Sequence, residues 1–111
     1  MKTEKRPLNK LGSEESVSKL ADLFRLMGDT SRLRIILASL HEPISVSDIA
    51  EKLELSQSLV SHHLRLLRAA RVVRSERRGK QVFYVAADAH IQCVIEDMMA
   101  HIGELDHEED D

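Results

Sequence analysis

Four side chains in the last quarter of the chain have the types and the spacing of metal ligands: Asp88, His90, His101 and Glu104. Each pair offers an imidazole nitrogen and a carboxylate oxygen, and so forms a two-ligand half site. On one helix His90 and His101 would lie roughly 16 Å apart at ~1.5 Å per residue, whereas metal–ligand bonds are ~2 Å long. The two half sites therefore cannot meet within one chain. Two such helices packed antiparallel about a twofold axis would join unlike half sites into two equivalent four-ligand sites.

The groups beside these ligands leave alternatives open. His107 and Asp106 continue the spacing and could replace a ligand. Cys93 lies one turn from His90, where it would act as a redox group, as a further metal contact, or as a small buried hydrophobe, and we favour the last of these. A site filled by four protein ligands leaves no position for a metal-bound water, so we do not expect an enzyme.

A second chemical feature is a helix face that carries no acid. The segment from Ser56 to about Ala70 has apolar residues at helical spacing, namely Leu59, Val60, Leu64 and Leu67. The opposite face carries Gln57, Ser58, Ser61, His62, Arg65 and Arg68. Because Ser, Gln and His can hydrogen-bond to base edges and Arg can contact phosphates, we expect this face to bind double-stranded DNA. His63 is expected in the core or at an interface instead.

Two runs rich in β-branched and aromatic residues follow this helix. Val72–Arg77 and Gln81–Val85 flank Arg78-Gly79-Lys80, which predicts a β-hairpin with a basic tip. The residues of this hairpin expected to reach DNA phosphates are Arg77, Arg78 and Lys80. A short helix, a tight turn, a helix with a polar basic face and a basic hairpin together describe a winged helix-turn-helix.

The expected fold is mainly α-helical, with five helices and this hairpin as the wing. The alternative N-caps of the first three helices are Ser13 or Ser16, Asp29 or Thr30, and Ser45 or Ser47. Gly28 is predicted to end the first helix in the left-handed conformation. The fifth helix is predicted from Ala89 to about Leu105. We expect the first and fifth helices to form a homodimer interface that buries Val17, Leu20, Val94, Ile95 and Met98.

The length of 111 residues predicts one domain. We divide it into a flexible arm (1–12), a DNA-binding and dimerisation domain (13–105) and an acidic tail (106–111). The net charge of −3 conceals a segregation, since residues 56–80 carry seven basic residues and one acid, whereas residues 86–111 carry nine acids and no Lys or Arg. The sequence lacks the ~18 apolar residues of a membrane span and the apolar core of a signal peptide, so we expect a cytoplasmic protein.

Three stretches of the sequence resemble the ArsR/SmtB family of winged-helix, metal-sensing repressors. They are Gly28–Leu37, similar to the family's D-x-x-R-x-x-I pattern, Leu55–Leu64, similar to its recognition helix, and the wing Arg77–Lys80 followed by Phe83-Tyr84. The resemblance covers about residues 17–105. It implies that the residues entering the major groove are Gln57, Ser58, Ser61 and His62.

The resemblance also implies which metal ion the regulator senses. The D-x-H…H-x-x-E pattern is similar to the site of the zinc-sensing branch, which implies zinc, with cobalt or nickel as alternatives. The family's other common site uses cysteines in a C-V-C sequence, but Ile44–Asp48 has serines there, so thiolate sensing of soft metals is not expected. We expect a homodimeric repressor that zinc releases from operator DNA, derepressing metal-export or sequestration genes. The alternative is a regulator of the same fold that senses a redox signal through Cys93.

Overall fold

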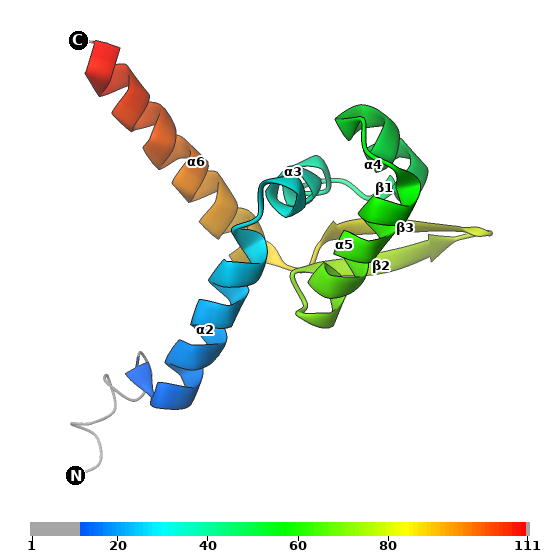
Figure 1. Ribbon diagram of the computed structural model, residues 1–111, viewed down its shortest axis with the longest axis horizontal. Helices are drawn as coiled ribbons and strands as arrows, with labels where there is room; N and C mark the ends of the chain where they lie inside the picture. Colours follow the sequence, from blue (N-terminus) through cyan, green and yellow to red (C-terminus); the bar gives the residue numbers. More distant parts are fainter. Residues whose placement is uncertain (1–11, 111) are drawn as a thin grey trace.

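The computed structural model describes the backbone of residues 12–110 and the side chains of residues 12–106. Within this part of the chain lie five helices and a three-stranded antiparallel sheet of order β1-β3-β2. Their bounds are α2 (Glu14–Met27), α3 (Thr30–Ala38), β1 (Ile44–Ser45), α4 (Val46–Leu53), α5 (Gln57–Ala69), β2 (Val73–Arg78), β3 (Gln81–Ala86) and α6 (Ala89–Asp110). The predicted winged helix-turn-helix is confirmed, with α4 and α5 as its two helices and β2–β3 as its wing (Figure 1).

The molecule has a body and two arms. The helices α3, α4 and α5 and the sheet form the body, and α2 and α6 extend away from it in different directions (Figure 1). The radius of gyration is 16.9 Å, whereas a compact domain of this length would have about 13 Å. The two arms therefore keep long faces that no other element of the described chain covers.

Each of the four helices α2 to α5 begins with a side-chain cap. In every case the oxygen of the cap accepts a hydrogen bond from the backbone N–H three residues later, which is the standard way of satisfying a helix N-terminus. The caps are Ser13, Asp29, Ser45 and Ser56. Where the sequence offers two candidates, the first is the cap and the second lies inside the helix.

The predicted role of Gly28 is wrong. Its φ is −77°, so it does not adopt the left-handed conformation, although a Cβ at this position would lie 3.1 Å from the backbone oxygen of Phe24. The left-handed residues are instead Glu54 (φ 59°) after α4, Arg71 (φ 63°) after α5 and Gly79 (φ 64°) at the tip of the wing. The sequence shows little sign of the first two, because glycine is the usual residue at such helix ends.

The hydrophobic core lies between the body helices and the base of the wing. Its fully buried side chains include Ile35, Ile36, Ile49, Val60, Leu64, Leu67, Val72 and Val73. The first turns of α6 join this core through Ile95. The Gln92 side chain also donates to the backbone oxygen of Leu40 at 3.0 Å, and His41 Nε2 lies 2.7 Å from Glu96 Oε2. The start of α6 is therefore fixed to the body.

Three further details differ from the sequence-based expectation. The strand β1 was not predicted, because its two residues, which pair with Tyr84 and Phe83, are too few to show an alternating pattern. Leu59, predicted to point inward, is 39% exposed. The helix α6 continues past Leu105 to Asp110.

No helix in the described part of the chain is long and apolar enough to span a membrane.

Candidate DNA-binding surface and metal half sites

The recognition face, by which we mean the six polar residues predicted on α5, lies at the surface. Ser61 is half-buried, and the exposed members are Gln57, Ser58, His62, Arg65 and Arg68. The opposite side of α5 holds the helix in place, because Val60, Leu64 and Leu67 are buried in the core. The recognition face thus presents hydrogen-bonding and cationic groups to solvent on a helix that the core keeps rigid.

His63 lies on the inner side of α5 and is buried, which confirms the prediction of a core histidine. Its Nδ1 is 3.4 Å from Nη1 of Arg32, and Arg32 Nε donates to the backbone oxygen of Leu26 at 2.6 Å. Arg32 therefore connects the end of α2, the start of α3 and the middle of α5. Burial and, after it, the Arg32 guanidinium lower the pKa of His63, so the neutral ring is favoured.

The wing carries both paired and unpaired cations. Arg74 Nη1 lies 2.6 Å from Glu76 Oε2, and Arg78 Nη2 lies 3.1 Å from Glu76 Oε1. The hydrogen bond from Arg74 and then that from Arg78 lower the pKa of Glu76. No carboxylate pairs with Arg77 or Lys80 among the side chains that the structure describes. Of the three wing residues predicted to contact DNA, Arg77 and Lys80 therefore carry positive charges that no described carboxylate pairs with.

The pairing of Arg78 was not predicted from the sequence. Alternate residues of a strand share a face, so the period of two places Arg74, Glu76 and Arg78 side by side. The Arg78 guanidinium also lies 5.2 Å from the centre of the Phe83 ring. The Glu76 carboxylate offsets part of the cationic charge of the wing. The position of Glu76 between Arg74 and Arg78 in the strand alternation is the sequence signal for this pairing.

The first metal half site is assembled at the start of α6. Asp88 Oδ1 accepts a hydrogen bond from the backbone N–H of Ile91 at 3.1 Å, and Asp88 Oδ2 lies 3.6 Å from His90 Nδ1. The side chains of His90 and Asp88 are 94% and 55% exposed. The Ile91 amide and, after it, His90 lower the pKa of Asp88. The carboxylate is therefore ionised at neutral pH and lies open to solvent beside an imidazole.

The second half site, His101 and Glu104, is exposed about three to four turns further along α6. No three His, Cys, Asp or Glu side chains within the described range come together as a metal site in one chain. Between the two half sites lies Asp97, which shares their side of the helix at 100° per residue and is not among the four predicted ligands. We call the line of His90, Cys93, Asp97, His101 and Glu104 the ligand stripe.

Cys93 does not occupy the predicted environment. It is exposed rather than buried, and it lies in the ligand stripe instead of against the core. Helical periodicity carries a signal for this exposure, because at 100° per residue Cys93 lies on the side of His90 and away from Val94 and Met98.

Beside the ligand stripe runs an apolar stripe of exposed residues on α6: Val94, Met98, Ile102 and Leu105. A second exposed apolar face, on α2, consists of Val17, Leu20 and Phe24. Exposed apolar patches of this length mark surfaces that bind other proteins. Of the five residues predicted at a dimer interface, four lie in these patches. The fifth, Ile95, is only 7% exposed and belongs to the core of its own chain, so it is not available to a partner.

Comparison with known proteins supports one family. Residues 29–75 match the family model described as "Bacterial regulatory protein, arsR family". A curated relative, the transcriptional repressor SmtB homolog of Synechocystis, is 35% identical over 94 residues, which cover 85% of this chain and 71% of the relative. The chain belongs to the ArsR family. As a member of that family it is a DNA-binding transcriptional regulator and not an enzyme.

Solved structures agree with the ArsR fold. Reduced HlyU from Vibrio cholerae is 32% identical, with a TM-score of 0.69 over 75% of this chain and 87% of HlyU. The Mycobacterium bovis protein Mb0332, described as a homodimeric winged helix-turn-helix domain, has a TM-score of 0.78 over 86% of this chain and 92% of its own. At 19% identity, Mb0332 supports the fold alone.

Proposed function

We propose that this ArsR-family regulator is a homodimeric repressor that binds operator DNA through α5 and the wing and is released by zinc. The observation that carries the proposal is the arrangement of α6. Two complementary half sites lie at different heights on one side of this helix, next to an apolar stripe that has no partner in the described chain.

The dimer follows from the apolar stripes. If α2 and α6 pack against the same helices of a second copy, the exposed apolar residues of both arms are removed from water. A twofold interface of antiparallel α6 helices places the start of one helix beside the middle of the other. Asp88 and His90 of each protomer would then face His101 and Glu104 of its partner.

The donor set fits zinc. Imidazole nitrogens and carboxylate oxygens are ordinary zinc ligands, and four of them complete a tetrahedral site without an open position. Asp88 is already ionised and close to His90, so this half site needs little rearrangement. Zinc held in this way would cross-link the two protomers. The same donors accept cobalt and nickel, and soft metals that require thiolates do not fit.

Release from DNA requires that zinc prefer a dimer geometry that does not fit the operator, because a ligand shifts an equilibrium only by its differential affinity for the two states. The start of α6 is fixed to the body by Ile95, by Gln92 and by the contact of His41 with Glu96. A change in the crossing of the two α6 helices therefore turns the bodies, and with them both recognition faces.

The test begins with operator DNA selected from a random-sequence library with the zinc-free protein. Zinc should then weaken the binding of this DNA by roughly 5–150-fold, the usual range of allosteric coupling. His101→Ala should bind the DNA equally well but respond to zinc no longer. Fluorescence anisotropy measures the DNA affinity, and competition with a chromogenic chelator measures zinc. An unchanged zinc response of His101→Ala would contradict the proposed site.

The position of Asp88 allows a cleaner variant than removal of the side chain. Serine is also a good N-cap, so Asp88→Ser should keep the start of α6 intact and lose only the metal ligand. Asp88→Ala should lose both the helix cap and the metal ligand, and the lost cap should decrease the free energy of unfolding by about 1 kcal/mol. Comparable zinc loss in the two variants, with a stability loss only in the second, separates ligation from helix capping.

A mixed dimer tests whether each site is shared. Asp88→Ser and His101→Ala chains with different affinity tags are combined, and the dimer that carries both tags is isolated. Each variant alone has a lesion in both sites, whereas the mixed dimer has both lesions in one site and leaves the other complete. One tight zinc per mixed dimer, and none in either parent, is the expected result. No recovery would exclude ligation between protomers.

A second candidate signal is oxidation at Cys93. The exposure of this thiol favours it, as does the likeness to HlyU, whose solved structure is described as the reduced form. In this case an oxidant, and not zinc, would release the operator, and Cys93→Ser would abolish the response. The same anisotropy assay, with hydrogen peroxide in place of zinc, distinguishes the two signals.

A further inference from the structure

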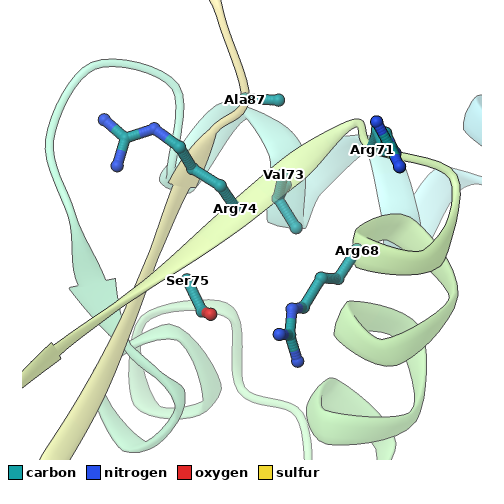
Figure 2. Close-up of a pocket in the computed structure, with 6 residues that line it drawn as sticks. All are labelled: Arg68, Arg71, Val73, Arg74, Ser75 and Ala87. Atoms are coloured by element: carbon teal, nitrogen blue, oxygen red, sulfur yellow. The ribbon is translucent and has the colours of Figure 1, made fainter.

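A groove runs between the C-terminal half of α5 and the wing. Its first part is a hollow of about 340 Å³, lined by Arg68 of α5, by Ser75 of β2 and by neighbouring residues (Figure 2). A second hollow of about 290 Å³ is lined by Arg65, Arg68 and Tyr84. Arg68 lines both hollows, so they are neighbours, and we call the two together the α5–wing groove.

No described side chain neutralises the positive charge of Arg65 and Arg68 in this groove. Among the side chains that the structure describes, no carboxylate forms an ion pair with Arg65 or Arg68. Arg74 also borders the first hollow, but it pairs with Glu76 and points away from Arg68 (Figure 2). The two free guanidinium groups of α5 therefore give the groove the electrostatics of an anion site.

The sheet supplies neutral donors on the facing side. Ser75 and Tyr84 are direct partners in the β2–β3 register, so their side chains share one face of the sheet. Figure 2 shows the Ser75 hydroxyl and the Arg68 guanidinium on facing sides of the first hollow. A hydroxyl group faces a guanidinium fork in the first hollow, and Arg65 and Tyr84 line the second. Such donors are suited to a group with several acceptor oxygens and a negative charge, which is the chemistry of a phosphate.

We propose that the α5–wing groove binds a phosphate group, held by Arg65 and Arg68 on one side and by Ser75 and Tyr84 on the other. The phosphate of a DNA backbone is one source. A helix of ~10–12 Å diameter fills a major groove of ~12 Å width, so the phosphates that border the groove run along the flanks of α5. This source rests on the proposed function. A free phosphate ion presents the same chemistry and is the other source.

The first arm of the test uses duplex DNA and two matched pairs of variants. Arg68→Gln should weaken DNA binding and reduce the slope of log K against log salt by about one, because one phosphate contact releases about one counterion. Arg74→Gln, which removes the paired arginine of the same hollow, should leave both quantities unchanged. Ser75→Ala and Tyr84→Phe should each lower affinity roughly 3- to 10-fold without changing the slope, whereas Ser18→Ala on α2 should have no effect.

The second arm titrates inorganic phosphate into the DNA-free protein at constant ionic strength. Signals of the Arg68 Nε–H and the Ser75 amide should shift in nuclear magnetic resonance spectra, and the shifts should disappear in Arg68→Gln. An effect in the DNA arm alone assigns the groove to backbone phosphates, and an effect in the phosphate arm alone assigns it to the free ion; both support the site. If neither arm shows an effect, the proposal is wrong. A wild-type protein that binds no DNA contradicts the proposed function but leaves the phosphate arm decisive.

Discussion

His63 makes the stability of the protein depend on pH at the level of a single side chain. Its folded pKa lies below the value of about 6.5 for an unfolded histidine, because burial and Arg32 disfavour the charged ring. Below that pH the unfolded chain takes up a proton that the folded chain does not. The stability associated with neutral His63 is therefore complete above pH 6.5 and is lost as the pH falls towards the folded pKa.

Urea unfolding between pH 8 and pH 5 tests this prediction. His63→Gln retains an acceptor for Arg32 but does not titrate, so it should lose less stability on acidification than the wild type. Equal pH dependence of the wild type and His63→Gln would show that the buried ring is not responsible.

At the candidate sites, the types of the ligand residues could be predicted from the sequence more fully than the exposure and pairing of the side chains. The pair of Asp88 and His90 could be proposed from the sequence because a carboxylate and an imidazole two residues apart are donor types that zinc accepts, and the structure brings them within 3.6 Å. The exposure of Cys93 and the pairing of Arg78 with Glu76 were missed, although helical periodicity places Cys93 on the side of His90 and strand alternation places Arg78 beside Glu76. What periodicity does not show is how far the body covers a helix, and the tertiary packing decides this, as the burial of Ile95 within its own chain shows.

At the scale of the elements, the ends of the two helix-turn-helix helices carry backbone strain. Glu54 follows α4 with a φ of 59°, and the N–H of Leu55 reaches back to the backbone oxygen of Ala50. Glycine adopts this conformation without the steric conflict of a Cβ, so Glu54→Gly should raise the free energy of unfolding by about 0.5–1 kcal/mol. Lys52→Gly, inside the same helix, should lower it by about 0.5–1 kcal/mol. Urea unfolding of both variants measures the contrast, and a loss of stability in Glu54→Gly would contradict the interpretation.

The elements were predictable where periodicity and caps agreed. All five helices of the described chain follow from apolar spacing of 3.6 residues, and four begin at a residue that could be named as a cap. The failures lie at positions where one conformation competes with another. Gly28, at the end of α2, does not adopt the predicted left-handed φ, whereas Glu54, at the end of α4, does. The backbone conformation at a helix end depends on where the following helix must start.

At the scale of the whole molecule, the unpartnered arms predict a dimer that one charge can disrupt. Met98 lies in the apolar stripe, and Ala100 lies on nearly the opposite side of α6 at 100° per residue. Met98→Glu would place two uncompensated charges in a twofold interface, so it should weaken dimerisation by about 100-fold or more. Ala100→Glu should leave it unchanged. Sedimentation at micromolar concentration distinguishes them, and a wild-type monomer under these conditions would contradict the dimer.

The exposure of the proposed ligands has an evolutionary consequence. Asp88, His90, His101 and Glu104 lie outside the hydrophobic core, and the capping role of Asp88 can be taken over by Ser, Thr or Asn. Mutations at these positions therefore meet little selection for folding, while the recognition face and the core remain under constraint. A gene duplicate could lose its response to one ion and acquire another signal on α6 within a few substitutions, and still recognise the same operator. The architecture allows signals to diversify faster than DNA targets.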